Sequence, residues 1–85
     1  MTEADAPRLA FPPDGATLET EGTVLARVAQ GTPPFTWLAA GRPVAIATRR
    51  REISLTLAPG APKLTVIDAQ GRAAHAQIEI RPRGD

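Results

Sequence analysis

The chain has 85 residues, of which 42% are hydrophobic, and it carries a formal net charge of +1 and no cysteine. A chain of this length forms one small domain that buries roughly 60–65% of the surface exposed by its unfolded form. The near-neutral charge argues against a nucleic-acid partner, the lack of cysteine excludes disulfides and thiolate metal sites, and no apolar run approaches the roughly 20 residues needed for direct membrane insertion.

The first third of the chain is predicted to form short strands separated by residues that break regular structure. Arg8–Phe11 is a brief strand, which Pro12–Gly15 ends as a turn or extended loop. Ala16–Glu19 is a short edge piece. Thr23–Ala29 is a longer strand in which every second residue is apolar and shares one face. Gln30–Pro34 is then a loop.

The middle of the chain continues the same pattern. Phe35–Ala39 is predicted to be a strand with both aromatic rings on one side, and Ala40-Gly41 turns the chain into Arg42–Ile46. This second strand is predicted to lie at a sheet edge, because Pro43 cannot donate a hydrogen bond to a neighbour. Ile53–Leu57 alternates apolar and polar residues and is expected to form a further strand.

The last part, Leu64 to Ile80, is predicted to be a hairpin in which an unbroken second strand ends at Ile80. Residues 68–71 form its turn. Asp68 can accept hydrogen bonds from nearby backbone N–H groups, and Gly71 adopts a positive φ without a Cβ clash.

About seven strands, spaced by glycine and proline, predict an all-β fold: a small antiparallel sandwich of the immunoglobulin-like or fibronectin III-like kind. Residues 8–81 form the domain in this interpretation, and residues 1–7 and 82–85 are disordered.

Trp37 is predicted to lie in the core between the two sheets. The predicted core contains Trp37, Phe35, Val24, Val28, Leu55, Leu64, Val66, Ala76 and Ile78. An alternative is that Trp37 is exposed as a stacking platform for a sugar, but a chain with three aromatic residues in total has little reason to place one outside its core.

Four segments in order resemble a known family. They are Pro12-Pro13-Asp14-Gly15-Ala16, Thr32-Pro33-Pro34-Phe35-Thr36-Trp37, Ala40-Gly41-Arg42-Pro43-Val44, and the run from Leu64 to Ala73, LTVIDAQGRA. This order is similar to the C-terminal domain of penicillin-binding protein 1C, a bifunctional peptidoglycan synthase. The family tends to have P-x-D-G-A, a proline loop before Trp, an N-G-x-P-like turn and L-T-V-x-D-x-x-G-R-x-A. Ala40 stands where the family commonly has Asn.

The resemblance implies a parent protein that is anchored in the bacterial inner membrane, faces the periplasm, and carries glycosyltransferase and transpeptidase domains. The transpeptidase motifs S-x-x-K, S-x-N and K-T-G are not found in this chain, whose single serine is Ser54. The chain itself is therefore expected not to be an enzyme, and no catalytic residue can be assigned.

Cofactor and metal chemistry is not expected either. His75 is the only histidine and is predicted to point outward, and one imidazole without clustered cysteines, histidines or carboxylates makes a poor metal site. The one charge cluster is Arg49-Arg50-Arg51, to which Arg42 can add. These four arginines are the predicted binding residues. The alternative is a solvated loop that protects a sheet edge from pairing.

Two functions remain open. The first is a noncatalytic accessory or interaction domain of a periplasmic penicillin-binding protein, whose partner is the parent's transpeptidase domain, a periplasmic protein or peptidoglycan. The second is a carbohydrate-binding or adhesive immunoglobulin-like module of another bacterial surface protein.

Overall fold

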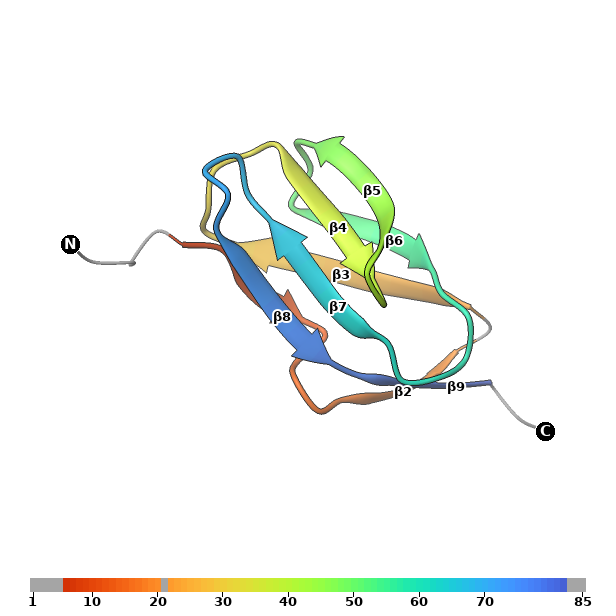
Figure 1. Ribbon diagram of the computed structural model, residues 1–85. Helices are drawn as coiled ribbons and strands as arrows, with labels where there is room; N and C mark the ends of the chain where they lie inside the picture. Colours follow the sequence, from red (N-terminus) through yellow and green to blue (C-terminus); the bar gives the residue numbers. More distant parts are fainter. Residues whose placement is uncertain (1–5, 21, 83–85) are drawn as a thin grey trace.

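The computed structural model describes residues 6–20 and 22–82, which form nine β-strands and no helix (Figure 1). The strands are β1 (Arg8–Phe11), β2 (Thr17–Thr20), β3 (Thr23–Ala29), β4 (Phe35–Ala39), β5 (Arg42–Thr48), β6 (Glu52–Thr56), β7 (Lys63–Ile67), β8 (Ala73–Gln77) and β9 (Glu79–Pro82). Within these residues there is accordingly no helix of the length and hydropathy that a membrane crossing needs. The predicted all-β class is confirmed.

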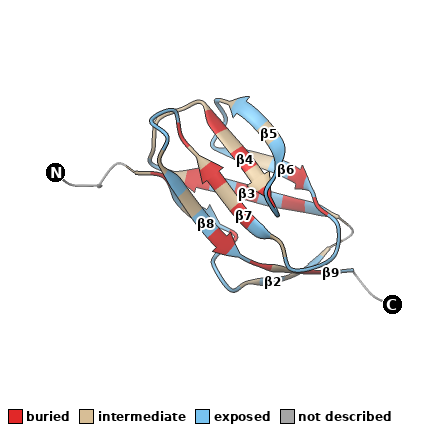
Figure 2. Ribbon diagram, in the orientation of Figure 1, coloured by how far each residue is buried: buried red, intermediate tan, exposed pale blue. Residues whose placement is uncertain are grey.

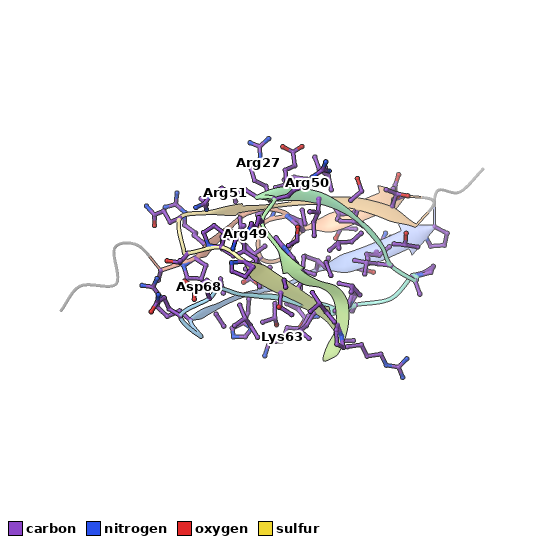
Figure 3. All side chains as sticks on the ribbon, turned by 90° about the horizontal axis from the view of Figure 1, so that it is seen from above. Arg27, Arg49, Arg50, Arg51, Lys63 and Asp68 are labelled. Carbon is purple, nitrogen blue, oxygen red and sulfur yellow. The ribbon has the colours of Figure 1, made fainter. Side chains whose placement is uncertain are left out.

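Two antiparallel sheets form the layers of the sandwich. One has the strand order β1-β3-β6 and the other β5-β4-β7-β8, while β2 and β9 form a separate parallel pair. Figure 3 shows the two layers seen along their edges, with side chains between them. The predicted edge position of β5 is confirmed by this order.

The core lies between the sheets because apolar side chains alternate along the strands that face it. In β4, the residues Phe35, Trp37 and Ala39 are buried, and Phe35 and Trp37 are 0% exposed. Figure 2 shows the alternation as red bands along β3, β4 and β7. All the residues predicted for the core are buried: Trp37, Phe35, Val24, Val28, Leu55, Leu64, Val66, Ala76 and Ile78.

The last strand differs from its prediction, because it is split in two. β8 ends at Gln77, which pairs with Lys63, the first residue of β7. The next N–H, that of Ile78, still donates to the Pro62 carbonyl at 3.2 Å, and the chain then changes partner, so that β9 pairs in parallel with β2. Ile78 and Ile80 remain buried through this change of partner, since the apolar side of the strand still faces the core.

The predicted domain boundaries stay a prediction, but one described residue beyond each of them contacts the domain. Pro7 is buried, and a Cβ added to Gly31 would lie 2.9 Å from the Pro7 Cβ, so Pro7 packs against the domain. Pro82 is the last residue of β9 and pairs with Thr20. The predicted disorder of residues 1–5 and 83–85 concerns positions outside the described residues.

Candidate functional site

The structure divides the four arginines predicted to bind into two groups. Arg42 is the first residue of β5, whereas Arg49, Arg50 and Arg51 follow the other end of that strand, and all four are exposed. Seven residues of strand at about 3.3 Å each separate Arg42 from Arg49 by roughly 20 Å. Arg42 therefore lies apart from the other three arginines, and binding by any of the four stays a prediction.

Arg51 is engaged with its own domain. Its guanidinium donates hydrogen bonds to the carbonyl oxygens of Gln30 at 2.5 Å and Gly31 at 3.1 Å. The same group lies 5.2 Å from the centre of the Phe35 ring, within the range of a cation–π contact. Gln30 and Gly31 both have positive φ, 62° and 79°. Arg51 thus holds a tight turn onto the core.

Arg49 and Arg50 project from the same loop and make no ion pair with any residue that the structure describes. Arg27 lies nearby on β3 and pairs with Glu52 at 2.9 Å. Figure 3 shows Arg27, Arg50 and Arg51 along the same side of the molecule. We call Arg49 and Arg50 the arginine corner. It presents two cations that have no ion-pair partner in the described part of the chain, on a loop that Arg51 fixes.

Asp68 ties the β7–β8 turn to the loop before β4. It is 5% exposed, and its carboxylate accepts hydrogen bonds from the backbone N–H groups of Thr32, Gln70 and Arg72. The Arg72 guanidinium pairs with it at 2.9 Å. In return, the Ala69 N–H donates to the Thr32 carbonyl at 2.8 Å. The turn role predicted for Asp68 is what its geometry supports.

The ionisation of Asp68 follows from these contacts. Burial by itself raises the pKa of this carboxyl, but the hydrogen bonds from Thr32 and Arg72 and the positive charge of Arg72 outweigh it, so the pKa lies below its ordinary value of 3.8. Asp68 is thus a carboxylate held in its charged form. Gly71, the other residue predicted for this turn, has a φ of 81° and donates its N–H to the Asp68 carbonyl at 3.0 Å.

Sequence reasoning missed a groove at the opposite end of β5. A hollow of about 620 Å³ lies between the β4–β5 hairpin, with Ala39, Ala40, Arg42 and Val44, and residues 56–62. The signal in the sequence is the run Ala58-Pro59-Gly60-Ala61-Pro62, whose small side chains leave space that a bulky side chain would fill.

Ser54 and His75, the single serine and the single histidine of the chain, are both exposed. Ser54 is exposed on β6, and its register partner on β3 is Leu25, which cannot accept a proton. His75 is exposed, with its Nδ1 2.9 Å from the Thr65 hydroxyl. Across residues 6–20 and 22–82, no group of three or more His, Cys, Asp or Glu residues could hold a metal ion. The expectation that the chain needs no cofactor stays a prediction.

Comparison with solved structures finds the same fold in other proteins. Fibronectin(III)-like modules of CbhA from Clostridium thermocellum match with a TM-score of 0.70 at 12% identity, over 92% of this chain and 99% of that one. SGBP-B of the Bacteroides ovatus mixed-linkage glucan utilization locus, solved in complex with a mixed-linkage heptasaccharide, matches with a TM-score of 0.60 at 19% identity, over 92% of this chain and 24% of that one.

A domain of titin matches with a TM-score of 0.51 at 10% identity, over 88% of this chain and 98% of that one. These likenesses confirm the immunoglobulin-like, fibronectin III-like fold and nothing further. No curated protein matches the chain. A sequence model of the Penicillin-Binding Protein C-terminus Family matches residues 1–80.

Proposed function

The chain belongs to the penicillin-binding protein C-terminus family, and from this we propose that it is a noncatalytic accessory domain of a penicillin-binding protein involved in peptidoglycan synthesis. Membership of the family places the chain in a cell-envelope context. In the proposal, the parent protein is anchored in the bacterial inner membrane and this domain faces the periplasm, where it positions the enzyme by binding another surface.

The observation that supports an interaction role is the arginine corner. Arg49 and Arg50 are exposed cations without ion-pair partners in the described part of the chain, and their loop is fixed by Arg51. A guanidinium pairs with carboxylates in a two-pronged geometry, and a fixed loop loses little conformational entropy on binding. The partner is then a surface rich in carboxylates, which the transpeptidase domain, a periplasmic protein or peptidoglycan would offer.

The absence of catalysis is supported by the surroundings of the single serine. A serine nucleophile needs a base within hydrogen-bond reach, and Ser54 stands opposite Leu25 on an exposed sheet face. We expect the purified chain not to be labelled by a fluorescent penicillin. Covalent labelling at Ser54 would contradict this part of the proposal.

The alternative, a carbohydrate-binding module, was suggested by an exposed Trp37, and Trp37 is not exposed. Trp37 and Phe35 are fully buried, and Phe11, the third aromatic residue, is 41% exposed. A sugar stacks on an exposed aromatic face, so Trp37 cannot serve as a platform. The likeness to SGBP-B is a likeness of fold at 19% identity and carries no ligand to this chain.

The test is sedimentation of the chain with purified peptidoglycan sacculi, together with capture of the parent enzyme's partners, at low and moderate salt. Replacing Arg49 and Arg50 with Ser should weaken binding at low salt, and added salt should weaken the wild-type binding, because exposed ion pairs are screened. The matched control replaces Arg8 and Arg81, two other exposed arginines, with Ser and removes the same charge. Equal loss in both variants, or none in the first, would overturn the arginine corner as the site.

A further inference from the structure

The groove beside Arg42 is a second candidate site, independent of the arginine corner. Its volume of about 620 Å³ falls within the range of pockets that hold small ligands. One wall comes from the β4–β5 hairpin and the other from the connection between β6 and β7, which crosses from one sheet to the other. The groove therefore opens at one end of the sandwich.

The walls of this groove are fixed by backbone hydrogen bonds. Gly60 and Ile80 exchange two of them, at 2.9 and 2.6 Å, which holds the wall formed by the β6–β7 connection. The Ala40 N–H donates to the Lys63 carbonyl at 3.0 Å, which holds the turn of the hairpin. A groove that exists before a ligand arrives costs little to organise.

The lining is mostly apolar and built mainly from small residues, with Thr56 and one charged side chain. Alanines, prolines and a glycine make up most of it, and among the described residues Arg42 is the only charged one that lines it. Arg42 is exposed and makes no ion pair with any residue that the structure describes. Lys63 lies beside the hairpin turn, on the opposite side of the molecule from Arg27, Arg50 and Arg51 (Figure 3). The small residues of the lining leave room for small ligand side chains, and Arg42 can pair with a ligand carboxylate.

The groove is continuous with the unpaired edge of β5. β5 is the edge strand of its sheet, and Val44 both lines the groove and belongs to that edge. Ile46, two residues further, is 70% exposed. Pro43 has no N–H, and Ala47 interrupts the strand with a φ of 55°, so the regular edge is limited to Val44–Ile46. An edge of three residues suits a short extended peptide.

A second copy of the chain fits this edge poorly. Two β5 strands paired antiparallel would bring Arg42 of one copy towards Arg49 and Arg50 of the other, and like charges repel. We propose instead that the groove binds a short, extended, separate peptide with small side chains, whose terminal carboxylate pairs with Arg42. Capture of a chain end by a cation and by edge-strand pairing is a recurring mode of peptide recognition.

The experiment is an NMR titration of the isotopically labelled chain with trialanine and with its C-terminal amide. Trialanine should shift the backbone amides of Ala40, Val44, Gly60 and Ala61. Removing the carboxylate in the amide form should weaken binding about fivefold, as expected for the loss of one exposed ion pair. Arg42→Gln should weaken trialanine binding by the same factor, and Arg42→Lys should restore part of it.

Two further variants separate the groove from the rest of the surface. Ala58→Trp places a bulky ring in the groove and should abolish the shifts although Arg42 and every other arginine remain. Arg8→Gln, at an exposed position outside both proposed sites, should leave binding unchanged. Well-dispersed amide spectra establish that each variant is folded. Equal binding of the acid and the amide, shifts centred on Arg49, or groove shifts that depend on protein concentration without peptide, as a second copy would give, would each overturn the proposal. None of these results bears on sacculus binding by the arginine corner.

Discussion

The two ends of the sandwich are held together by different means. At one end, which we call the clamped end, the loop of residues 30–34 meets the β7–β8 turn, and charged side chains make the connections: Asp68 binds Thr32 and Arg72, and Arg51 binds Gln30 and Gly31. At the other, the groove end, the contacts are mainly backbone pairs, Gly60–Ile80 and Ala40–Lys63, and the one side-chain bond to a groove residue is uncharged, from Gln77 Nε2 to the Ala61 carbonyl.

This difference decides which charges are free to act outside the domain. At the clamped end, one of the three consecutive arginines, Arg51, makes hydrogen bonds within the domain. At the groove end, the single Arg42 has no internal task among the described residues, although nothing in its sequence context singles it out. A cluster of like charges in a sequence therefore does not show which of its members is available for binding.

The largest effect is expected from the loss of Trp37, the largest fully buried side chain of the core. Trp37 is 0% exposed, and its Nε1 has no hydrogen-bond partner in residues 6–20 and 22–82, so its contribution is one of packing. Trp37→Ala should lower the free energy of unfolding by about 3–5 kcal/mol, which leaves a small domain close to unfolded. Thermal and urea denaturation measure this. A variant that melts like the parent would contradict the burial of Trp37.

The next prediction compares the loss of stability from one substitution at each end. Asp68→Asn removes the charge on which the clamped end converges, together with its ion pair to Arg72, and we expect a loss of about 2–4 kcal/mol in the free energy of unfolding. Arg42→Gln at the groove end should stay within about 0.5 kcal/mol, as for other exposed positions. Similar losses from both substitutions, measured by urea denaturation, would remove the distinction between the ends.

The pH dependence of stability sharpens the same comparison. Because the pKa of Asp68 is lower in the folded chain than its ordinary value of 3.8, the carboxylate stabilises the fold fully above that value, and the contribution is lost as the pH falls below it towards the folded pKa. Unfolding measured from pH 7 downwards should show wild-type stability falling below about pH 4, with a smaller fall in Asp68→Asn. Parallel curves for the two proteins would contradict the lowered pKa.

A smaller difference in stability is expected between substitutions of Arg51 and Arg50, which lie in the same loop. Arg51→Ala removes two hydrogen bonds and the contact with Phe35 and should cost about 1–2 kcal/mol, because all of these contacts are partly exposed to solvent. Arg50→Ala removes an equal charge with no such contacts and should cost less than about 0.5 kcal/mol. Equal melting temperatures for the two variants would show that Arg51 does not clamp the turn.

The sequence predicts the fold well because the alternation of apolar and polar residues, and the Pro and Gly residues that end strands, are local signals. The strands, the edge position of β5 and the buried set around Trp37 all follow from period-2 patterns and from the positions of Pro and Gly. The split of the last strand could not be predicted, since Ile78 and Ile80 keep the same alternation while the strand changes its partner from β7 to β2. The role of Arg51 depends on Gln30, 21 residues away in the sequence, and local patterns do not report such contacts.

The smallest effect concerns the turn that builds the groove end. Ala40 and Gly41 link β4 and β5 with φ values of 52° and 79°, and a two-residue hairpin turn with positive φ at both positions prefers Asn-Gly. Ala40→Asn should raise the free energy of unfolding by about 0.5–1 kcal/mol, because Asn adopts the left-handed conformation more readily than Ala. Gly41→Ala should act in the opposite direction through backbone strain alone, since no heavy atom lies within 4 Å of an added Cβ. Thermal denaturation of both variants measures this strain, and if both melt with the wild type, the groove end is held by its backbone pairs and not by its turn.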